Sequence, residues 1–366
     1  MFLWLLDYLA RAWPSAFGAG RLAALEKITF RASLAAVAAF ALALVLGPRL
    51  IRWLRARFPE PIKCDSPRIR QLHRPKQATP TMGGLFLVAG LVAGVLALGD
   101  LGNRYLQTAL VVVIGLAAVG ALDDLTKLRA RANGISARSK LLGQLVVAGV
   151  AAVLVYRHHL GVADGLALRL PWIETAPSLG IWFVPLAVIV IVGFSNAVNL
   201  TDGLDGLAGG CLIFAAGAMA LVAYASGHAQ LADYLNLPRL PGVGEMTIVA
   251  GAMIGGVLGF LWFNCHPAQV FMGDTGSLPL GGLLGLLAVV TRQEFLLLLV
   301  GGVFVVEAAS VVLQVGYYKW RRRRILLCAP LHHHFQFLGW PESRIVVRFW
   351  IAAAVCAILG LAALKL

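Results

Sequence analysis

Long apolar segments recur along the whole chain and alternate with short polar or basic loops. Ten of them contain 14 to 24 residues and at most one charged residue each. A helix rises about 1.5 Å per residue, so roughly 20 apolar residues cross a hydrocarbon layer about 30 Å thick. The segments are 30–48, 80–99, 105–122, 140–156, 181–195, 207–226, 247–263, 278–291, 295–318 and 346–364. The pattern predicts an all-α integral membrane protein with about ten transmembrane helices.

The loops predict the domain organisation. The shortest segments, 181–195 and 278–291, adjoin polar loops, so we expect these helices to begin or end inside protein rather than in lipid. Residues 1–27 mix charged residues and proline with Trp and Leu, which predicts an interfacial helix. Because no loop exceeds about 35 residues and a soluble domain usually needs about 50, residues 1–366 are predicted to form a single membrane domain.

The basic residues predict the orientation. Of 31 Lys and Arg, 21 fall in alternate loops, which the positive-inside rule places in the cytoplasm, with both termini outside. The net charge of +14 suits a basic face on anionic lipid, so the lipid bilayer is the expected partner and nucleic acid is not. The five cysteines fall in predicted cytoplasmic loops, at a cytoplasmic helix end or within the last span, so no disulfide framework is expected, and no Cys-x-x-Cys pair indicates a zinc site.

Five aspartates lie at the ends of the predicted spans, all on the predicted cytoplasmic side: Asp123, Asp124, Asp202, Asp205 and Asp274. An ionised carboxylate at mid-bilayer costs roughly 2.5 to 3.5 kcal/mol, so such acids tend to lie at the interface or to serve function. Their shared side predicts an active site at the cytoplasmic face.

Asp123 and Asp124 end the span 105–122. Neighbouring helix residues point about 100° apart, so the two carboxylates are expected to differ in role, one acting as a base and the other holding a metal or cation. The alternative is a solvated helix end with ion pairs such as Asp–Lys127.

Two further loops carry polar motifs. Asn196, Asn199 and Asp202 recur every three residues and would share a helix face that reads a polar ligand. In the second loop, Asp274 follows Gly273 and suits Mg²⁺ that also holds phosphate. For both loops the alternative is an ordinary turn. Phe271 is placed to stack on a nucleobase.

The histidines 332–334 follow a basic run, Lys319 and Arg321 to Arg324. Consecutive residues on a regular helix cannot all reach one ion, so hydrogen bonding to phosphate or sugar oxygens fits them better than metal ligation. The alternative is that these histidines belong to a belt of aromatic-like side chains at the membrane interface and bind no ligand. Lys76 and Thr81, at the entrance of 80–99, would face the same diphosphate as the aspartates, unless this segment is only a span start.

These motifs together carry a family resemblance. PTMGG (80–84), LDD (122–124), NAVNLTDGLDGLA (196–208), FMGDTGS (271–277) and PLHHHF (330–335), in this order, resemble the phospho-N-acetylmuramoyl-pentapeptide transferases. The aspartate motifs alone are typical of the wider superfamily of polyprenyl-phosphate sugar-phosphate transferases, and the triple histidine indicates this branch. Gln336 departs from the acidic residue that commonly follows HHHF.

The resemblance implies transfer of phospho-MurNAc-pentapeptide from UDP-MurNAc-pentapeptide to undecaprenyl phosphate, with Mg²⁺, forming lipid I and UMP in the bacterial cytoplasmic membrane. It also implies a homodimer. Asp274 would bind Mg²⁺, Asp123 would deprotonate or orient the lipid phosphate, and Asp124 would support the pair. The implied substrate-binding residues are Lys76, Thr81, Asn199, Asp202, Asn264, Phe271, Gly273, Ser277, Lys127, Lys140 and His332 to His334, with His333 in the catalytic set.

Two other functions share part of the pattern. A sister enzyme would transfer GlcNAc-1-phosphate from UDP-GlcNAc with the same aspartates and would lack the triple histidine. A secondary transporter would hold its coupling acids near the bilayer midplane, where only Glu307 is expected in this chain. One direct displacement and a phospho-enzyme both require clustered carboxylates, so both mechanisms stay open.

Overall fold

The computed structural model describes residues 8, 26–57, 79–129, 134–169 and 177–364. Within these ranges the chain is helical, with no strand beyond an isolated bridge between Ala167 and Ser178. The predicted interfacial helix falls in 1–27, most of which lies outside the described residues. The all-α class is therefore confirmed, and the single-domain organisation over 1–366 stays a prediction.

Each of the ten predicted segments contains a helix. The long helices are α3 (Ile28–Arg57), α6 (Arg104–Arg129), α7 (Ala137–His159), α8 (Phe183–Thr201), α9 (Leu207–Gly227), α11 (Met246–Asn264), α12 (Asp274–Thr291), α14 (Gly302–Arg321) and α16 (Glu342–Ala363). The shorter ones are α5 (Gly84–Leu98), α10 (Ala229–Tyr234), α13 (Glu294–Val300) and α15 (Leu331–Phe337), with single 3-10 turns at η2 (Gly180–Trp182) and η3 (Val243–Glu245). Eight helices of the described chain are long and apolar enough to cross a membrane, or nine if α13 and α14 count as one span.

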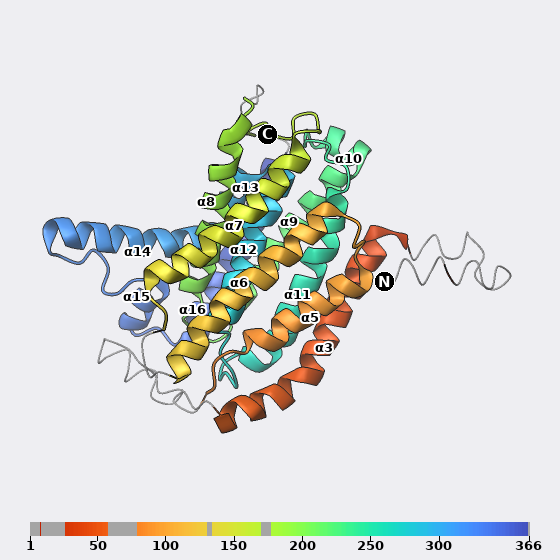
Figure 1. Cartoon of the computed structure of the whole chain (residues 1–366). Helices are drawn as coiled ribbons and strands as arrows, with labels where there is room; N and C mark the ends of the chain where they lie inside the picture. The colour runs from red at the N-terminus through yellow and green to blue at the C-terminus, as the bar shows by residue number, and fades with distance from the viewer. Residues whose placement is uncertain (1–7, 9–25, 58–78, 130–133, 170–176, 365–366) are drawn as a thin grey trace.

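Helix α12 forms the centre of the bundle (Figure 1). All of its residues are buried, and it contacts α5, α6, α8 and α9. Its first residue is Asp274, so the central helix carries a carboxylate to one end of the bundle. The prediction that the helix over 278–291 begins inside protein is thus confirmed.

Two predicted spans are shortened or broken in the structure, whereas the helices α3, α6 and α8 extend past the predicted ends. Helix α5 begins at Gly84 rather than at residue 80, because residues 80–84 pair with the loop before α12. The predicted span 295–318 is divided between α13 and α14, whose axes meet at 87°. Gly301 and Gly302 lie at the break, where glycine disfavours a continuous helix. Helix α14 consequently projects sideways from the bundle (Figure 1).

The two ends of the described chain lie together. Ile28, which begins α3, lies beside Gly244 of η3, and Leu364, after α16, packs against a small cluster that includes Ala225 at the end of α9. Asp274 begins α12 at the opposite end of the bundle, beside the end of α6. Both described ends therefore lie away from the aspartates.

Candidate active site

Three carboxylates converge where α6 ends and α12 begins. Asp123 and Asp124 lie in the last turns of α6, Asp274 is the first residue of α12, and all three are buried. One oxygen atom from each lies within 4.8 Å of the others. The three aspartates that the motifs predicted to meet therefore do lie in one place, although 150 residues separate Asp124 from Asp274.

Two lysines and an asparagine surround Asp274. Its Oδ2 lies 3.2 Å from Lys127 Nζ and 2.6 Å from Lys140 Nζ. Its Oδ1 accepts a hydrogen bond of 2.7 Å from Asn199 Nδ2, which also donates to Ser277 Oγ at 2.8 Å. The carboxylates and ammonium groups form one compact charged cluster at the end of an apolar bundle. Such a cluster is suited to a divalent cation and to phosphate, which both need fixed charges.

The neighbouring Asp123 and Asp124 share the ion-pair partner Lys127 but accept hydrogen bonds from different backbone groups. Asp123 accepts the backbone N–H of Ile135 at 2.8 Å and lies 2.8 Å from Lys127. Asp124 accepts the N–H groups of Asp274 at 3.2 Å and Thr275 at 2.9 Å, and the Thr275 hydroxyl at 2.7 Å. Asp124 therefore caps the N-terminus of α12, and Asp123 faces Lys127 and the loop before α7.

The segment 80–84 pairs with the loop before α12. Phe271 N–H donates to Pro80, and the N–H groups of Gly83 and Gly84 donate to Phe271 and Met272, each at 2.8 Å. This pairing places Thr81 at the site: a Cβ on Gly273 would lie 3.0 Å from Thr81 Oγ1 and 2.6 Å from Asp124. With φ of +71°, Gly273 also has a backbone conformation that other residues avoid.

The loop between α8 and α9 lies beside the cluster. Asp202 ends α8, and burial, followed by the negative charge of Asp274, raises the pKa of Asp202 to about 7. The side chain of Asn264 is engaged at both ends, since its Oδ1 accepts the N–H of Gly206 at 3.0 Å and its Nδ2 donates to the Val270 carbonyl at 2.8 Å. Asn264 thus joins two motif loops through their backbones.

The triple histidine begins α15 and its members have three different environments. His332 is fully buried and donates from its backbone to Glu307 Oε1 at 3.1 Å, while its Nδ1 lies 3.2 Å from Glu307 Oε2. His333 Nδ1 pairs with Gln336 at 2.7 Å, and His334 Nδ1 accepts the N–H of Leu327 at 3.2 Å.

The His332 ring connects the histidines to the α8–α9 loop. A Cβ on Gly203 would collide with His332 Nε2, a buried atom that has no hydrogen-bond partner among the residues that the structure describes. Gly203 follows Asp202 directly. The triple histidine is therefore in contact with the loop between α8 and α9, which lies beside the three carboxylates.

Known proteins are similar to this chain over nearly its whole length. The Glycosyl transferase family 4 profile matches residues 106–292. A phospho-N-acetylmuramoyl-pentapeptide-transferase of Solidesulfovibrio magneticus is 49% identical, with 93% of this chain and 94% of the relative covered. Proteins of the same name from Koribacter versatilis and Oleidesulfovibrio alaskensis are each 47% identical over 93% of this chain, covering 93% and 94% of their own lengths.

The chain belongs to the phospho-N-acetylmuramoyl-pentapeptide transferase family. The resemblance carried by the five motifs is thus confirmed, and the chain is a multi-pass membrane transferase. Transport, which Glu307 left open, is excluded as the main function. The Glu307 carboxylate instead pairs with His332 of the triple histidine.

The family motifs contain most of the clustered residues but not all of their partners. Lys76 lies outside the described residues. Sequence reasoning did not identify the supporting roles of Glu307 or Thr275, because a partner across the bundle leaves no trace in local spacing. Asp205, grouped with the other aspartates from its position at a span end, lies with His266 and Glu342 in a separate cluster.

Proposed function

We propose that this chain transfers phospho-MurNAc-pentapeptide from UDP-MurNAc-pentapeptide to undecaprenyl phosphate, forming lipid I and UMP. This would be the first membrane step of peptidoglycan synthesis. The observation that carries the proposal is the cluster of three buried carboxylates and two lysines at one end of an apolar bundle. A water-soluble diphosphate and a lipid phosphate can meet only at such a membrane end. The name of the relatives, phospho-N-acetylmuramoyl-pentapeptide-transferase, supports the transferred group.

The cluster fits Mg²⁺. Its donors are carboxylate oxygens, the ligands that this hard cation prefers, and one oxygen of each aspartate is within 4.8 Å of the others. Asp274, aided by Asp123, would hold the ion. Bound Mg²⁺ would neutralise charge on the diphosphate during transfer.

The protein groups around the ion would bind and orient the two phosphates. Lys127 and Lys140 pair with the Asp274 carboxylate. A cation bound to Asp274 would neutralise this carboxylate, so the two ammonium groups would donate to phosphate oxygens instead. Asp123 would orient or deprotonate the lipid phosphate. Asp124 would act as a positioning residue, since its hydrogen bonds go to Asp274 and Thr275.

The remaining pocket would bind the nucleotide and sugar phosphate. Phe271 would stack on the uracil, and Asn264 would act through the loops that it joins. The other proposed contacts are Lys76, Thr81, Asn199, Asp202, Gly273, Ser277, His332, His333 and His334.

The orientation in the membrane follows from charge. We place the carboxylate cluster at the cytoplasmic face of the bacterial inner membrane, with both termini outside. The positive-inside distribution of Lys and Arg and the position of both described ends away from Asp274 support this orientation. The homodimer stays a prediction.

Release of UMP from UDP-MurNAc-pentapeptide, with undecaprenyl phosphate and Mg²⁺, tests the function in purified protein. Asp274→Asn should lower the rate by roughly a hundredfold or more, because metal stabilisation of the transferred phosphate contributes several kcal/mol. Asp164→Asn, at an exposed aspartate, is the matched control and should retain activity. Preference for UDP-GlcNAc as donor would refute the substrate, and normal Mg²⁺ dependence in Asp274→Asn would refute the metal ligand.

A further inference from the structure

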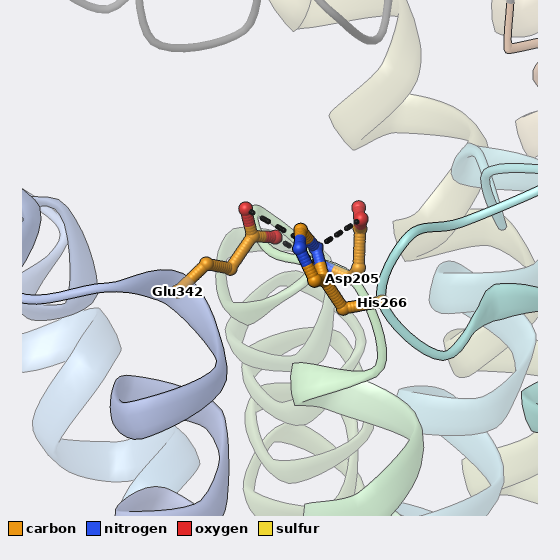
Figure 2. Close-up of side chains that lie close together, drawn as sticks. All are labelled: Asp205, His266 and Glu342. Atoms are coloured by element: carbon orange, nitrogen blue, oxygen red, sulfur yellow. Dashed lines mark hydrogen bonds and ion pairs between the residues drawn. The ribbon is translucent and has the colours of Figure 1, made fainter.

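A second cluster of metal-ligating side chains lies apart from the three site carboxylates. It consists of Asp205 in the loop between α8 and α9, His266 in the loop between α11 and α12, and Glu342 at the start of α16. Figure 2 shows the His266 ring between the two carboxylates, with both acids pointing toward it. Three segments far apart in the sequence thus direct ligand atoms to one point.

The spacing of these atoms suits a tetrahedral ion. His266 Nδ1 lies 3.1 Å from Asp205 Oδ2 and 3.9 Å from Glu342 Oε2, and the three ligand atoms are within 4.8 Å of one another. Zinc bonds of about 2.0–2.1 Å place tetrahedral ligands roughly 3.3 Å apart, a value between the two observed distances. We propose that Asp205, His266 and Glu342 form a zinc site whose fourth position is open to water.

The ligands are held in place by hydrogen bonds to backbone. Asp205 Oδ2 accepts the N–H of Ala268 at 3.1 Å, and Glu342 Oε1 accepts the N–H of Asp205 at 2.7 Å. The side chains of Asp205 and Glu342 are 1% and 12% exposed, whereas that of His266 is 47% exposed. The carboxylates are therefore fixed before an ion arrives, and the histidine lies on the side from which an ion can enter.

The two clusters differ in ligand chemistry. Asp123, Asp124 and Asp274 offer only oxygen, which suits Mg²⁺. The imidazole nitrogen of His266 adds a softer ligand that favours zinc over Mg²⁺. Zinc should therefore bind at Asp205, His266 and Glu342 even when Mg²⁺ saturates the first cluster.

A bound ion would connect the α8–α9 and α11–α12 loops, which both carry residues of the active site. Asp205 follows Asp202 by three residues, and His266 lies in the loop that leads to Asp274. Trp350 of α16 already donates to the Gly206 carbonyl at 3.1 Å, so α16 and the α8–α9 loop are in contact beside the cluster. Zinc would add a bond from this loop to both His266 and α16.

Zinc titration of the full-length protein, purified with a histidine-free tag and saturated with Mg²⁺, tests the proposal without any substrate. We expect one tight zinc per chain by calorimetry, and bound Co²⁺ should show the visible absorption of tetrahedral coordination. His266→Ala and Glu342→Gln should each weaken binding at least about tenfold. The matched controls His228→Ala, at an exposed histidine, and His334→Ala should bind as wild type does.

Three results would overturn the site. The first is wild-type protein that takes up no zinc at micromolar concentrations of the ion. The second is zinc binding that survives in both His266→Ala and Glu342→Gln. The third is zinc binding that is lost in His334→Ala, since the ion would then lie at the triple histidine. Because two ligand variants are compared, one that fails to fold leaves the other to decide.

Discussion

Asp124→Asn separates the capping role of Asp124 from the chemistry of the cluster. The Asp124 carboxylate is buried and accepts three hydrogen bonds at the N-terminus of α12, two of them from the backbone of Asp274 and Thr275. The positive end of the helix dipole also favours a negative charge there. Asparagine keeps one oxygen as an acceptor but presents an NH₂ group to at least one of these donors.

The expected loss follows from those contacts. A hydrogen bond to a charged group contributes about 1.5–3 kcal/mol, and a charge at a helix N-terminus adds about 0.3–1 kcal/mol. Removal of the buried charge also relieves its repulsion from Asp274, so the net cost to the first turn of α12 should be about that of one hydrogen bond, about 1.5 kcal/mol, which increases its local opening roughly tenfold.

Hydrogen exchange of the ion-free protein in detergent measures this opening. In Asp124→Asn, the amides of Asp274 and Thr275 should exchange roughly tenfold faster. Asp164→Asn is the matched control, because Asp164 is exposed and lies in the loop after α7, away from the cluster. It should leave exchange at the start of α12 unchanged. Equal exchange at Asp274 and Thr275 in wild type and Asp124→Asn would show that the cap is not what holds α12 in place.

Three further predictions concern the loop after α8 and its contacts. Burial raises the pKa of Asp202 to about 7, so this side chain stays neutral in the folded protein at pH values where it is ionised in the unfolded chain. The contribution of Asp202 to stability is therefore complete below about pH 4 and is lost as the pH rises through 7. Thermal midpoints of ion-free Asp202→Asn should therefore exceed those of wild type increasingly from pH 4 to 7, and a constant difference would contradict this pKa. Glu307→Gln removes one acceptor from His332 and should lower UMP release roughly ten- to a hundredfold, with the Mg²⁺ dependence unchanged; a large shift in that dependence would instead connect the pair to the metal. Gly203→Ala should reduce both the melting temperature and the rate, because its Cβ meets the His332 ring, whereas Gly217→Ala, whose Cβ has nothing within 4 Å, should reduce neither.

The sequence alone determined the class of fold and indicated that the site lies at the ends of the spans. Lipid cannot hydrogen-bond a backbone, so spans must be apolar and helical, and that requirement is visible in any window of about 20 residues. Carboxylates are costly in hydrocarbon, so Asp123, Asp124 and Asp274 were expected at span ends, where they do lie. The motif order then indicated the family.

Only the tertiary structure decided which of these groups meet. Local spacing gives the direction of a side chain from its own helix but not the partner across the bundle. It therefore could not show that Asp124 caps α12, that Glu307 pairs with His332, or that Asp205 joins His266 rather than the other aspartates. These contacts join residues 25 to 151 positions apart, and they form because packing around α12 brings the ends of several helices together.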